Sequence, residues 1–344
     1  MSARQDMTTL GTLAAAGKLR LLYVLGTPRS NSTVVCRLLG ERLDGAVYEP
    51  AMPNSGNPLG HFAKLLLTAY SAAREKAGAD RPIVLAVKDL DGFLTPEMSD
   101  FILVASAHIV FTIRDPALQY PSLSRQFVEE FSPLFRIRST LRHPIEQNWF
   151  LWHMLRWLPR FWGLTRDELG PGQNLLRAAA AGFNYASWLG QADHLESARI
   201  ALAAERITIL DASLSRLYPR ETTGMLASIA DACAAAPVQS ESREFAGHSR
   251  MAANSHWANE ARAGGDIKPL SLDAGRRFDD PAAAAFAAKV SASLYPQYLS
   301  AFFDPSHRQL AEARQRGLPP GAPASLRLLV EASDSAEAGR TFAF

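Results

Sequence analysis

Residues 21–40 read LLYVLGTPRSNSTVVCRLLG, a short apolar run followed by a turn rich in small polar residues and by the pattern of an amphipathic helix. When a strand, a loop and a helix follow one another in this way, the unpaired N–H groups of the first helical turn lie just beyond the strand, together with the positive end of the helix dipole. Such a position favours a bound phosphate or sulfate. The stretch therefore predicts an α/β fold with an anion site after its first strand.

The loop within this stretch, Gly26 to Thr33, has the length of a Walker A loop but lacks its signature. Asn31 stands in place of the second Gly and Ser32 in place of the Lys, and the cation of the loop is Arg29. The Walker Lys reaches the outer phosphates of a triphosphate, so a loop without it is poorly equipped for ATP. An Arg surrounded by neutral donors suits a compact anion of lower charge.

The small polar residues of the loop leave two interpretations open. Asn31 tolerates the left-handed conformation that a Gly would supply, so the loop can still wrap an anion, with the hydroxyls of Ser30, Ser32 and Thr33 as donors. The simpler alternative is a helix capped by Ser30 or Ser32 after a turn that contains Pro28.

The chain as a whole has the composition of a globular domain. Its 344 residues are enough to bury a large core. The 36 basic and 34 acidic residues leave a net charge of only +2, which is too small to attract nucleic acid or an acidic membrane to the molecule as a whole. Its two cysteines, Cys36 and Cys233, make no disulfide framework, and the sequence has neither zinc-ligand spacing nor a long apolar segment. We expect Cys36 in the core, no metal, no stable membrane insertion and a reducing, cytoplasmic location.

Four short apolar runs read as buried parallel strands, each followed by a turn and a helical pattern. They are Leu21 to Leu25, Ile83 to Val87, His108 to Ile113 and Arg206 to Leu210. In such a fold a ligand lies beyond the carboxyl ends of the strands, so the residues just after each run are candidates for a site. These are Arg29 and its neighbours, Lys88 with Asp89, Arg114 with Asp115 and Pro116, and Asp211.

One α/β domain, residues 19–315, is expected between a flexible N-terminus, residues 1–18, and a C-terminal tail, residues 316–344. Between about residues 133 and 196 no strand pattern occurs, and we expect a helical, aromatic-rich insertion there. Its tryptophans favour packing against the sheet, with an apolar acceptor pocket or a partner surface as the alternative. They are Trp149, Trp152, Trp157, Trp162 and Trp188.

A second anion-binding candidate follows the run HIVFTI. Arg114 precedes Asp115-Pro116, a natural strand-to-helix turn, and Ser122 comes eight residues after Arg114. On a helix that begins near Pro116, Ser122 lies in the second turn, so Arg114 and Ser122 could close on one phosphate. Taken alone, an Arg-Asp-Pro turn is usually structural.

Taken together, GTPRSNST at residues 26–33 and FTIRDPALQYPS at residues 111–122 resemble the PAPS-dependent sulfotransferase family. The stretch ERITILDASLSRLYPRETTGMLASI, residues 205–229, resembles the late strand and helix of many members. The resemblance implies an α/β, P-loop-type three-layer sandwich with a central parallel sheet. It also implies 3′-phosphoadenosine 5′-phosphosulfate (PAPS) as the donor, with 3′-phosphoadenosine 5′-phosphate (PAP) as the product and no metal.

The same resemblance assigns roles to the two motifs. Arg114 and Ser122 would bind the 3′-phosphate, and Asn31 departs from the usual Gly of the family's first loop. The 5′-phosphosulfate would be held by Arg29, Ser30, Asn31, Ser32 and Thr33.

Candidate catalytic residues follow from position. Glu49 comes twenty residues after Arg29, where family members that use a carboxylate base carry a Glu, although a Glu paired with a nearby Arg is the structural alternative. Lys88 matches a Lys that contacts the bridging oxygen or the acceptor in many members, and Asp89 would orient it or serve in the turn. Leu90 stands where the cytosolic branch of the family has a His base. This difference favours Glu49 as the general base but does not decide between Glu49 and Lys88. Arg29 would stabilise charge on the departing phosphate.

The C-terminal part of the chain adds further candidates. Trp257 and residues 262–268 are similar to the basic, Gly-containing loop that closes over the 3′-phosphate in some members, which makes Arg262 and Lys268 candidate binders. A surface loop with scattered charge is the alternative. Among the histidines, His61 is the candidate for an acceptor site.

The function expected from the sequence is transfer of a sulfuryl group from PAPS to a hydroxyl or amine of a small, apolar or aromatic acceptor. The alternatives are a P-loop kinase or NTPase that uses ATP with magnesium, and a non-catalytic PAP-binding protein. The partner expected is the small-molecule acceptor, with no nucleic acid, and the oligomeric state is left open.

Overall fold

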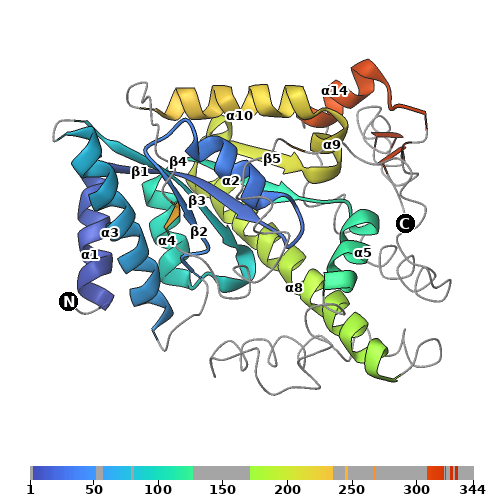
Figure 1. The fold of residues 1–344 in the computed structure, drawn as a ribbon, viewed down its shortest axis with the longest axis horizontal. Helices are drawn as coiled ribbons and strands as arrows, with labels where there is room; N and C mark the ends of the chain where they lie inside the picture. Colours follow the sequence, from blue (N-terminus) through green and yellow to red (C-terminus); the bar gives the residue numbers. More distant parts are fainter. Residues whose placement is uncertain are drawn as a thin grey trace.

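Strand β1 (Leu19–Gly26) lies inside the sheet because it is apolar on both faces, and all of its residues except Arg20 are buried. The computed structural model describes residues 3–51, 57–78, 81–126, 171–234, 245–246, 267, 308–320, 322, 326–327 and 330–331. Their six strands form one sheet in the order β5-β4-β1-β3-β2-β6. All neighbouring strands are parallel, so the predicted α/β fold with a parallel sheet is confirmed (Figure 1).

The remaining elements alternate with the strands along the chain. The other strands are β2 (Ala46–Tyr48), β3 (Ile83–Leu90), β4 (Ser106–Ile113), β5 (Ile207–Asp211) and β6 (Phe245–Ala246). The α-helices are α1 (Ala3–Ala15), α2 (Ser32–Gly40), α3 (Pro58–Ala77), α4 (Pro96–Ala105), α5 (Pro116–Gln126), α8 (Pro171–Ala201), α9 (Ala212–Leu217), α10 (Pro219–Cys233) and α14 (Arg308–Arg316). Two short 3₁₀ turns, η1 (Asp91–Phe93) and η3 (Ala204–Arg206), complete them.

All four predicted apolar runs are strands. They correspond to β1, β3, β4 and β5, each extended or shifted by a few residues at its ends. Strands β2 and β6 were not predicted, because runs of three and two residues are too short to show a pattern.

Helices cover both faces of the sheet and divide the core into two clusters. On one face, α2 packs on β1 and β3, and α10 packs on α2 and β4, through residues such as Val35, Leu39 and Leu226. The predicted burial of Cys36 is confirmed on this face, where its side chain is fully buried. On the other face lie α1, α3, α4 and α8, with Phe62 against Phe101 in an edge-to-face contact.

The two ends of the chain contribute to the larger cluster. Residues 3–15, expected to belong to a flexible segment, instead form α1, which packs on α3 and buries Leu10 completely. Leu326, in the expected tail, is also fully buried in that cluster. Amphipathic spacing in the first helix supplies the apolar side that this packing requires.

The part of the expected insertion that the structure describes is α8. Trp188 on this helix is buried against the core, in keeping with the packing interpretation of the aromatic residues. The other four tryptophans of the segment lie outside the described residues: Trp149, Trp152, Trp157 and Trp162.

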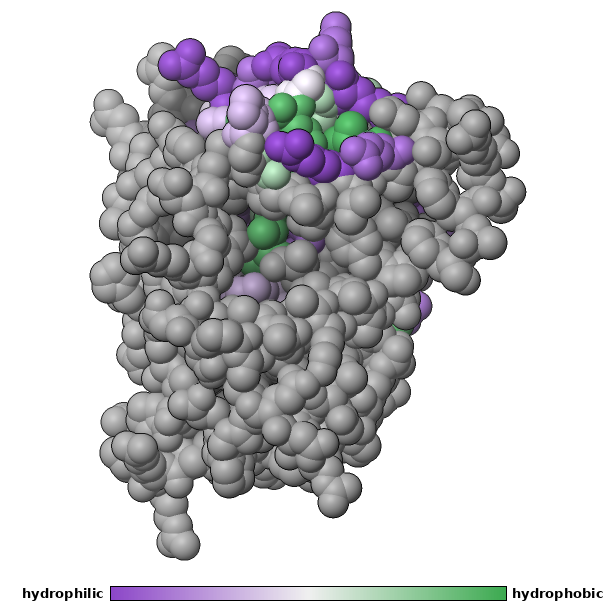
Figure 2. Space-filling view, turned by 90° about the vertical axis from the view of Figure 1, so that its right-hand side faces the viewer, coloured by the Kyte–Doolittle hydropathy of each residue, from purple (hydrophilic) through white to green (hydrophobic). Residues whose placement is uncertain are grey.

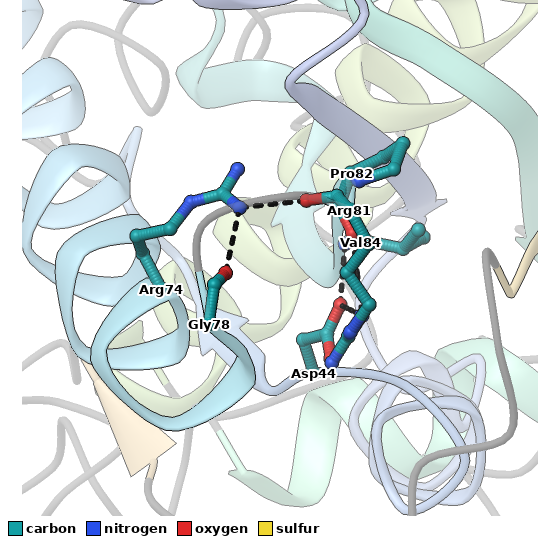
Figure 3. A network of polar contacts seen from close by, with 6 residues as sticks. All are labelled: Asp44, Arg74, Gly78, Arg81, Pro82 and Val84. Carbon is teal, nitrogen blue, oxygen red and sulfur yellow. Dashed lines mark hydrogen bonds and ion pairs between the residues drawn. The ribbon is translucent and has the colours of Figure 1, made fainter.

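The amino ends of β2 and β3 are tied together by a network of polar contacts (Figure 3). The guanidinium of Arg81 donates to both carboxylate oxygens of Asp44, at 2.9 and 2.5 Å, and the N–H of Val84 donates to the same carboxylate at 2.8 Å. Arg74 on α3 donates to the carbonyls of Gly78 and Arg81, at 3.0 and 2.7 Å. The network fixes where the chain enters β3, at the end of the sheet remote from the predicted site.

Helix α14 closes the C-terminal side of the described structure. Gln309 accepts a hydrogen bond from the N–H of Asp211 at 2.8 Å and donates to Ser215 at 3.0 Å, while Arg316 pairs with Glu221 and lies over the ring of Tyr218. Figure 2 shows the molecule from this side, where hydrophilic residues dominate the upper part of the surface and hydrophobic ones form small areas between them. Searching the described helices reveals none with the length and apolarity needed to cross a membrane.

Candidate functional site

The candidate site lies where β1 and β4 end side by side. The chain leaves β1 through α2 toward β2 on one side, and leaves β4 through α5 and α8 toward β5 on the other. In open parallel sheets, ligands bind in the crevice at such a reversal of strand order. Residues 27–31 after β1 and residues 114–115 after β4 both lie at this point, joined by a hydrogen bond from the N–H of Thr27 to the carbonyl of Thr112 at 3.1 Å.

The loop folds back closely on the strand from which it leaves. A side chain at Gly26 would lie 2.6 Å from both Ser32 Cβ and Thr112 Oγ1, so glycine is required there. Ser30, with its side chain buried, donates from Oγ to the carbonyl of Thr27 at 2.6 Å and contacts Thr112 Oγ1 at 2.8 Å. The hydroxyl of Ser30, one of the predicted donors, is therefore used inside the loop.

Two residues of the loop adopt the left-handed conformation. Asn31 has φ 63°, as its side chain permits, and Arg29 has φ 64°, which a long side chain rarely adopts. Such residues cost free energy and persist where the surrounding structure holds them, often at functional sites. The capability predicted for Asn31 is confirmed, whereas nothing in the sequence predicted it for Arg29.

The start of α2 is not capped in the usual way. Asn31 is the N-cap residue, yet its side chain forms no capping hydrogen bond, because the left-handed backbone differs from the extended backbone of ordinary caps. The alternative of a cap by Ser30 or Ser32 is therefore wrong. Since no side chain of the cap residue covers the N–H groups of the first turn, they suit an anion. Ser32 and Thr33, both predicted donors, are the first two residues of this turn.

The second predicted motif meets the first at Arg29. Arg29 Nε donates to Ser122 Oγ on α5 at 3.1 Å, and Arg114 Nη1 donates to the carbonyl of Arg29 at 3.3 Å. The side chain of Arg114 is buried, and Ser122 is partly exposed. The guanidinium of Arg114 therefore contacts the backbone of Arg29, 85 residues away in the sequence, while the guanidinium of Arg29 contacts Ser122.

Two of the three candidate catalytic residues, Glu49 and Lys88, form an ion pair. Lys88 Nζ donates to Glu49 Oε1, and both side chains are largely buried. Lys88 is on β3 in register with Tyr48, and Glu49 follows Tyr48 directly with φ 51°, a third left-handed residue. The structural alternative, a Glu49 paired with a nearby Arg, stays a prediction beside this contact with Lys88. The pair lies at the same carboxyl edge of the sheet as the loop.

Asp89 lies on the opposite face of β3 from Lys88. Its carboxyl group accepts hydrogen bonds from the hydroxyl of Tyr23 and from the N–H of Ala51, at 2.9 Å for the latter. Burial raises the pKa of Asp89 to about 8, against the opposing effect of these two donors. Asp89 therefore holds the segment after Glu49 rather than lying beside Lys88 as an orienting group.

Of the remaining predicted residues, two lie in helix or helix-cap positions and two lie outside the described residues. Asp211 caps α9 and accepts from the N–H of Asp115 at 3.0 Å, which ties the ends of β4 and β5 together. His61 is in the first turns of α3, and partial burial lowers its pKa. Arg262 and Lys268 lie outside the described residues. Within the described residues, no group of three or more His, Cys, Asp or Glu side chains could hold a metal ion.

Comparison with known proteins finds no relative of this chain. No family model, no curated protein and no solved structure matches it. Its function must therefore be inferred from the chemistry of the site.

Sequence reasoning did not predict that Gln119 and Trp188 support the loop. Gln119 on α5 donates to the carbonyl of Pro28, and Trp188 on α8 donates to Gln119. Gln119 is within the quoted FTIRDPALQYPS stretch, but a Gln inside a helix carries no signal of its own. Its role becomes visible only when α5 and α8 are placed against the loop.

Proposed function

We propose that this protein is a PAPS-dependent sulfotransferase with a P-loop-type anion site. The observation that carries the proposal is the contact between Arg29 and Ser122, which joins the two motifs that resemble this family. Each motif alone has an ordinary structural interpretation. Their meeting at a reversal of strand order, around two buried or half-buried guanidinium groups, supports a ligand with two separate anionic groups.

The residues of the loop fit a phosphosulfate. The first turn of α2 lacks a side-chain cap, the adjacent cation is an Arg, and the other donors are neutral. This donor set matches a group of low charge better than a triphosphate with magnesium. Arg29 and the first turn of α2 would hold the 5′ end of the donor, and Arg114 with Ser122 would hold its 3′-phosphate.

The ion pair supports a division of roles between Glu49 and Lys88. In such a pair the carboxylate is unprotonated and the ammonium is protonated, so Glu49 can accept a proton and Lys88 can donate one. Glu49 would take the proton of the acceptor hydroxyl or amine, and Lys88 would stabilise the departing phosphate oxygen. The donor supplies an SO₃ unit: its sulfur–oxygen bond to phosphate breaks as a bond to the acceptor atom forms.

The acceptor we propose is a small molecule with apolar or aromatic character. The segment that would contribute its pocket carries five of the six tryptophans of the chain. Aromatic side chains favour such ligands over a highly charged glycan, which would need clustered basic residues.

The proposal is tested by incubating the protein with sulfur-labelled PAPS and a library of phenols, alcohols and amines. Mass spectrometry should detect an added SO₃ group on at least one acceptor, and the label should move with it. A matched incubation with Arg29→Lys should show reduced transfer, because an ammonium cannot reproduce the guanidinium fork, whereas Arg220→Lys on the exposed surface of α10 should not. Binding of ATP with magnesium in preference to PAP, or absence of transfer with every acceptor, would contradict the proposal.

A further inference from the structure

Helix α8 is connected to the loop after β1 (residues 27–31) through Gln119 of α5, and it contacts the end of β1 directly through Gln191. Trp188 Nε1 donates to Gln119 Oε1 at 2.9 Å, and Gln119 Nε2 donates to the carbonyl of Pro28 at 2.5 Å. Gln191, one helical turn beyond Trp188, donates from Nε2 to the carbonyl of Leu25 at 2.8 Å. Both the end of β1 and the peptide before Arg29 are thus connected to one helix.

The chemistry of the groups fixes the orientation of the Gln119 amide. An indole N–H is only a donor and a backbone carbonyl is only an acceptor, so the amide oxygen must face Trp188 and the amide nitrogen must face Pro28. Gln119 is fully buried and Trp188 nearly so, which keeps water from competing for these groups. A reversed amide would place two donors together at one end and two acceptors at the other.

The carbonyl of Pro28 belongs to the peptide bond that leads into Arg29, the residue with φ 64°. This peptide and Arg29 are held at three points from the α5 side. Gln119 binds the carbonyl of Pro28, Ser122 binds Arg29 Nε, and Arg114 binds the carbonyl of Arg29. A left-handed Arg persists only where its surroundings over-determine it, and these contacts supply that restraint.

We propose that Gln119 and Trp188 are positioning residues that hold Arg29 in its left-handed conformation, and that α8 thereby sets the affinity of the loop for its anion. The identity of that anion, PAP, rests on the proposed function, whereas the restraint on the loop does not. Neither residue needs to touch the ligand, because both act through the Pro28–Arg29 peptide.

Gln119→Glu is the sharpest variant, because it preserves size and still accepts from Trp188, but its ionised carboxyl cannot donate to Pro28. We expect the affinity for PAP at about pH 9, above the raised pKa of the introduced carboxyl, to fall about tenfold or more, since small displacements of binding groups have effects of this order. Burial raises the pKa of the introduced carboxyl, and in its protonated form it can donate again. The affinity relative to wild type should therefore recover toward about pH 5.5. Gln315→Glu, at an exposed position of α14, is the matched control and should bind as wild type does at each pH.

Trp188→Phe tests the hydrogen bond from the indole N–H of Trp188 to Gln119. It removes the indole N–H and leaves the amide of Gln119 without its orienting donor, so we expect PAP affinity to fall about fivefold. In the Gln119→Glu background the same change should have little further effect on affinity, because two equivalent carboxylate oxygens need no orientation. Such non-additivity is what shared action through one peptide predicts.

A measurement without ligand separates this inference from the proposed function. Amide hydrogen exchange of residues 27–33 should become about tenfold faster in Gln119→Glu and in Trp188→Phe than in wild type or Gln315→Glu. Unchanged exchange in folded variants overturns the inference, whether or not PAP binds. If the wild type binds no PAP while exchange responds as expected, the proposed function fails and the positioning role stands. If Gln119→Glu does not fold, Trp188→Phe decides by the same readouts.

Discussion

Lys88 on β3 and Glu49 after β2 form a buried ion pair at the carboxyl edge of the sheet. The two residues come from different strands, and the backbone of Glu49 is left-handed, so the pair depends on an unfavourable local conformation. Burial of two charges is itself expensive and is offset only by close geometry. A pair of this kind at the same edge as the loop after β1 is consistent with the proposed role in proton transfer.

Removing either member of the pair should reduce stability and abolish most of the activity. Glu49→Gln removes the carboxylate that pairs with the buried Lys88 ammonium, and Lys88→Met removes that ammonium from Glu49, so we expect each to lower the free energy of unfolding by about 3 kcal/mol. The double variant should lose less than the sum of the two, since no isolated charge remains. Urea unfolding measures these values, and strict additivity would contradict the interaction.

The same variants separate catalysis from binding. Sulfate transfer should fall about 10²- to 10⁴-fold in Glu49→Gln, as expected for loss of a general base, while PAP affinity stays within a few-fold of wild type. Retention of full transfer activity in both single variants would remove the pair from the mechanism.

Asn31 should be replaceable by Gly but not by a β-branched residue. Gly adopts φ 63° without steric cost, so Asn31→Gly should keep both PAP affinity and thermal stability close to wild type. Asn31→Val should lower the free energy of unfolding by about 1–2 kcal/mol, because a left-handed conformation is strained for such a side chain. Equal melting temperatures for the Gly and Val variants would argue against the left-handed loop.

Asp91 should make stability depend on pH. Burial raises its pKa from 3.8 to about 8, and Ser187 on α8 donates to its carboxyl at 2.5 Å. Below the pKa that Asp91 has in the unfolded chain, its carboxyl is protonated in both the folded and the unfolded state. The contribution of Asp91 to the free energy of unfolding is therefore fully present at such a pH. As the pH rises toward 8 only the unfolded chain releases the proton, and the contribution is lost at a slope of up to about 1.4 kcal/mol per pH unit.

Asp91→Asn should remove that slope while keeping an acceptor for Ser187. Urea unfolding between about pH 5 and pH 8 should therefore show a flatter profile for the variant than for wild type. Asp89, whose pKa is also raised to about 8, remains in both proteins and leaves a residual slope. Parallel profiles for the two proteins would contradict a buried, protonated Asp91.

The network at the amino end of the sheet should matter for stability and not for binding. The side chain of Asp44 is 4% exposed and that of its partner Arg81 is 22% exposed. Asp44→Ala should lower the free energy of unfolding by about 2–3 kcal/mol, and PAP affinity of the folded protein should not change. Asp231→Ala, which removes an exposed pair with Arg42, should cost less than about 1 kcal/mol. Equal effects of the two substitutions would contradict the role given to Asp44.

The sheet could be predicted because its long strands are continuous apolar runs. β1, β3, β4 and β5 were each found from such a run, and the residues after them led to Arg29, Lys88 and Arg114. β2 and β6 were missed because their identity as strands comes from pairing with a neighbour rather than from their own few residues.

The site was only partly predictable, since its contacts depend on backbone geometry. Spacing suggested that Arg114 and Ser122 lie near one phosphate, and the family resemblance placed them on the same ligand as Arg29. Neither the contact between Arg29 and Ser122 nor the pairing of Lys88 with Glu49 was anticipated. Left-handed Arg29 and Glu49 belong to residue types with no preference for that conformation, so only the fold reveals them. The inward hydrogen bond of Ser30 likewise depends on Thr112, a residue of another strand.

The proposed function requires that the loop after β1 and the Arg114–Ser122 segment bind one nucleotide that carries a 3′-phosphate. The most direct measurement is calorimetric titration of the wild type and of Arg114→Met with PAP and with 5′-AMP, which lacks that phosphate. We predict that wild type binds PAP at least about tenfold more tightly than AMP, as charge-assisted hydrogen bonds to one phosphate require, and that Arg114→Met loses most of this preference. Equal affinity of the wild type for PAP and AMP would show that Arg114 and Ser122 do not recognise a 3′-phosphate.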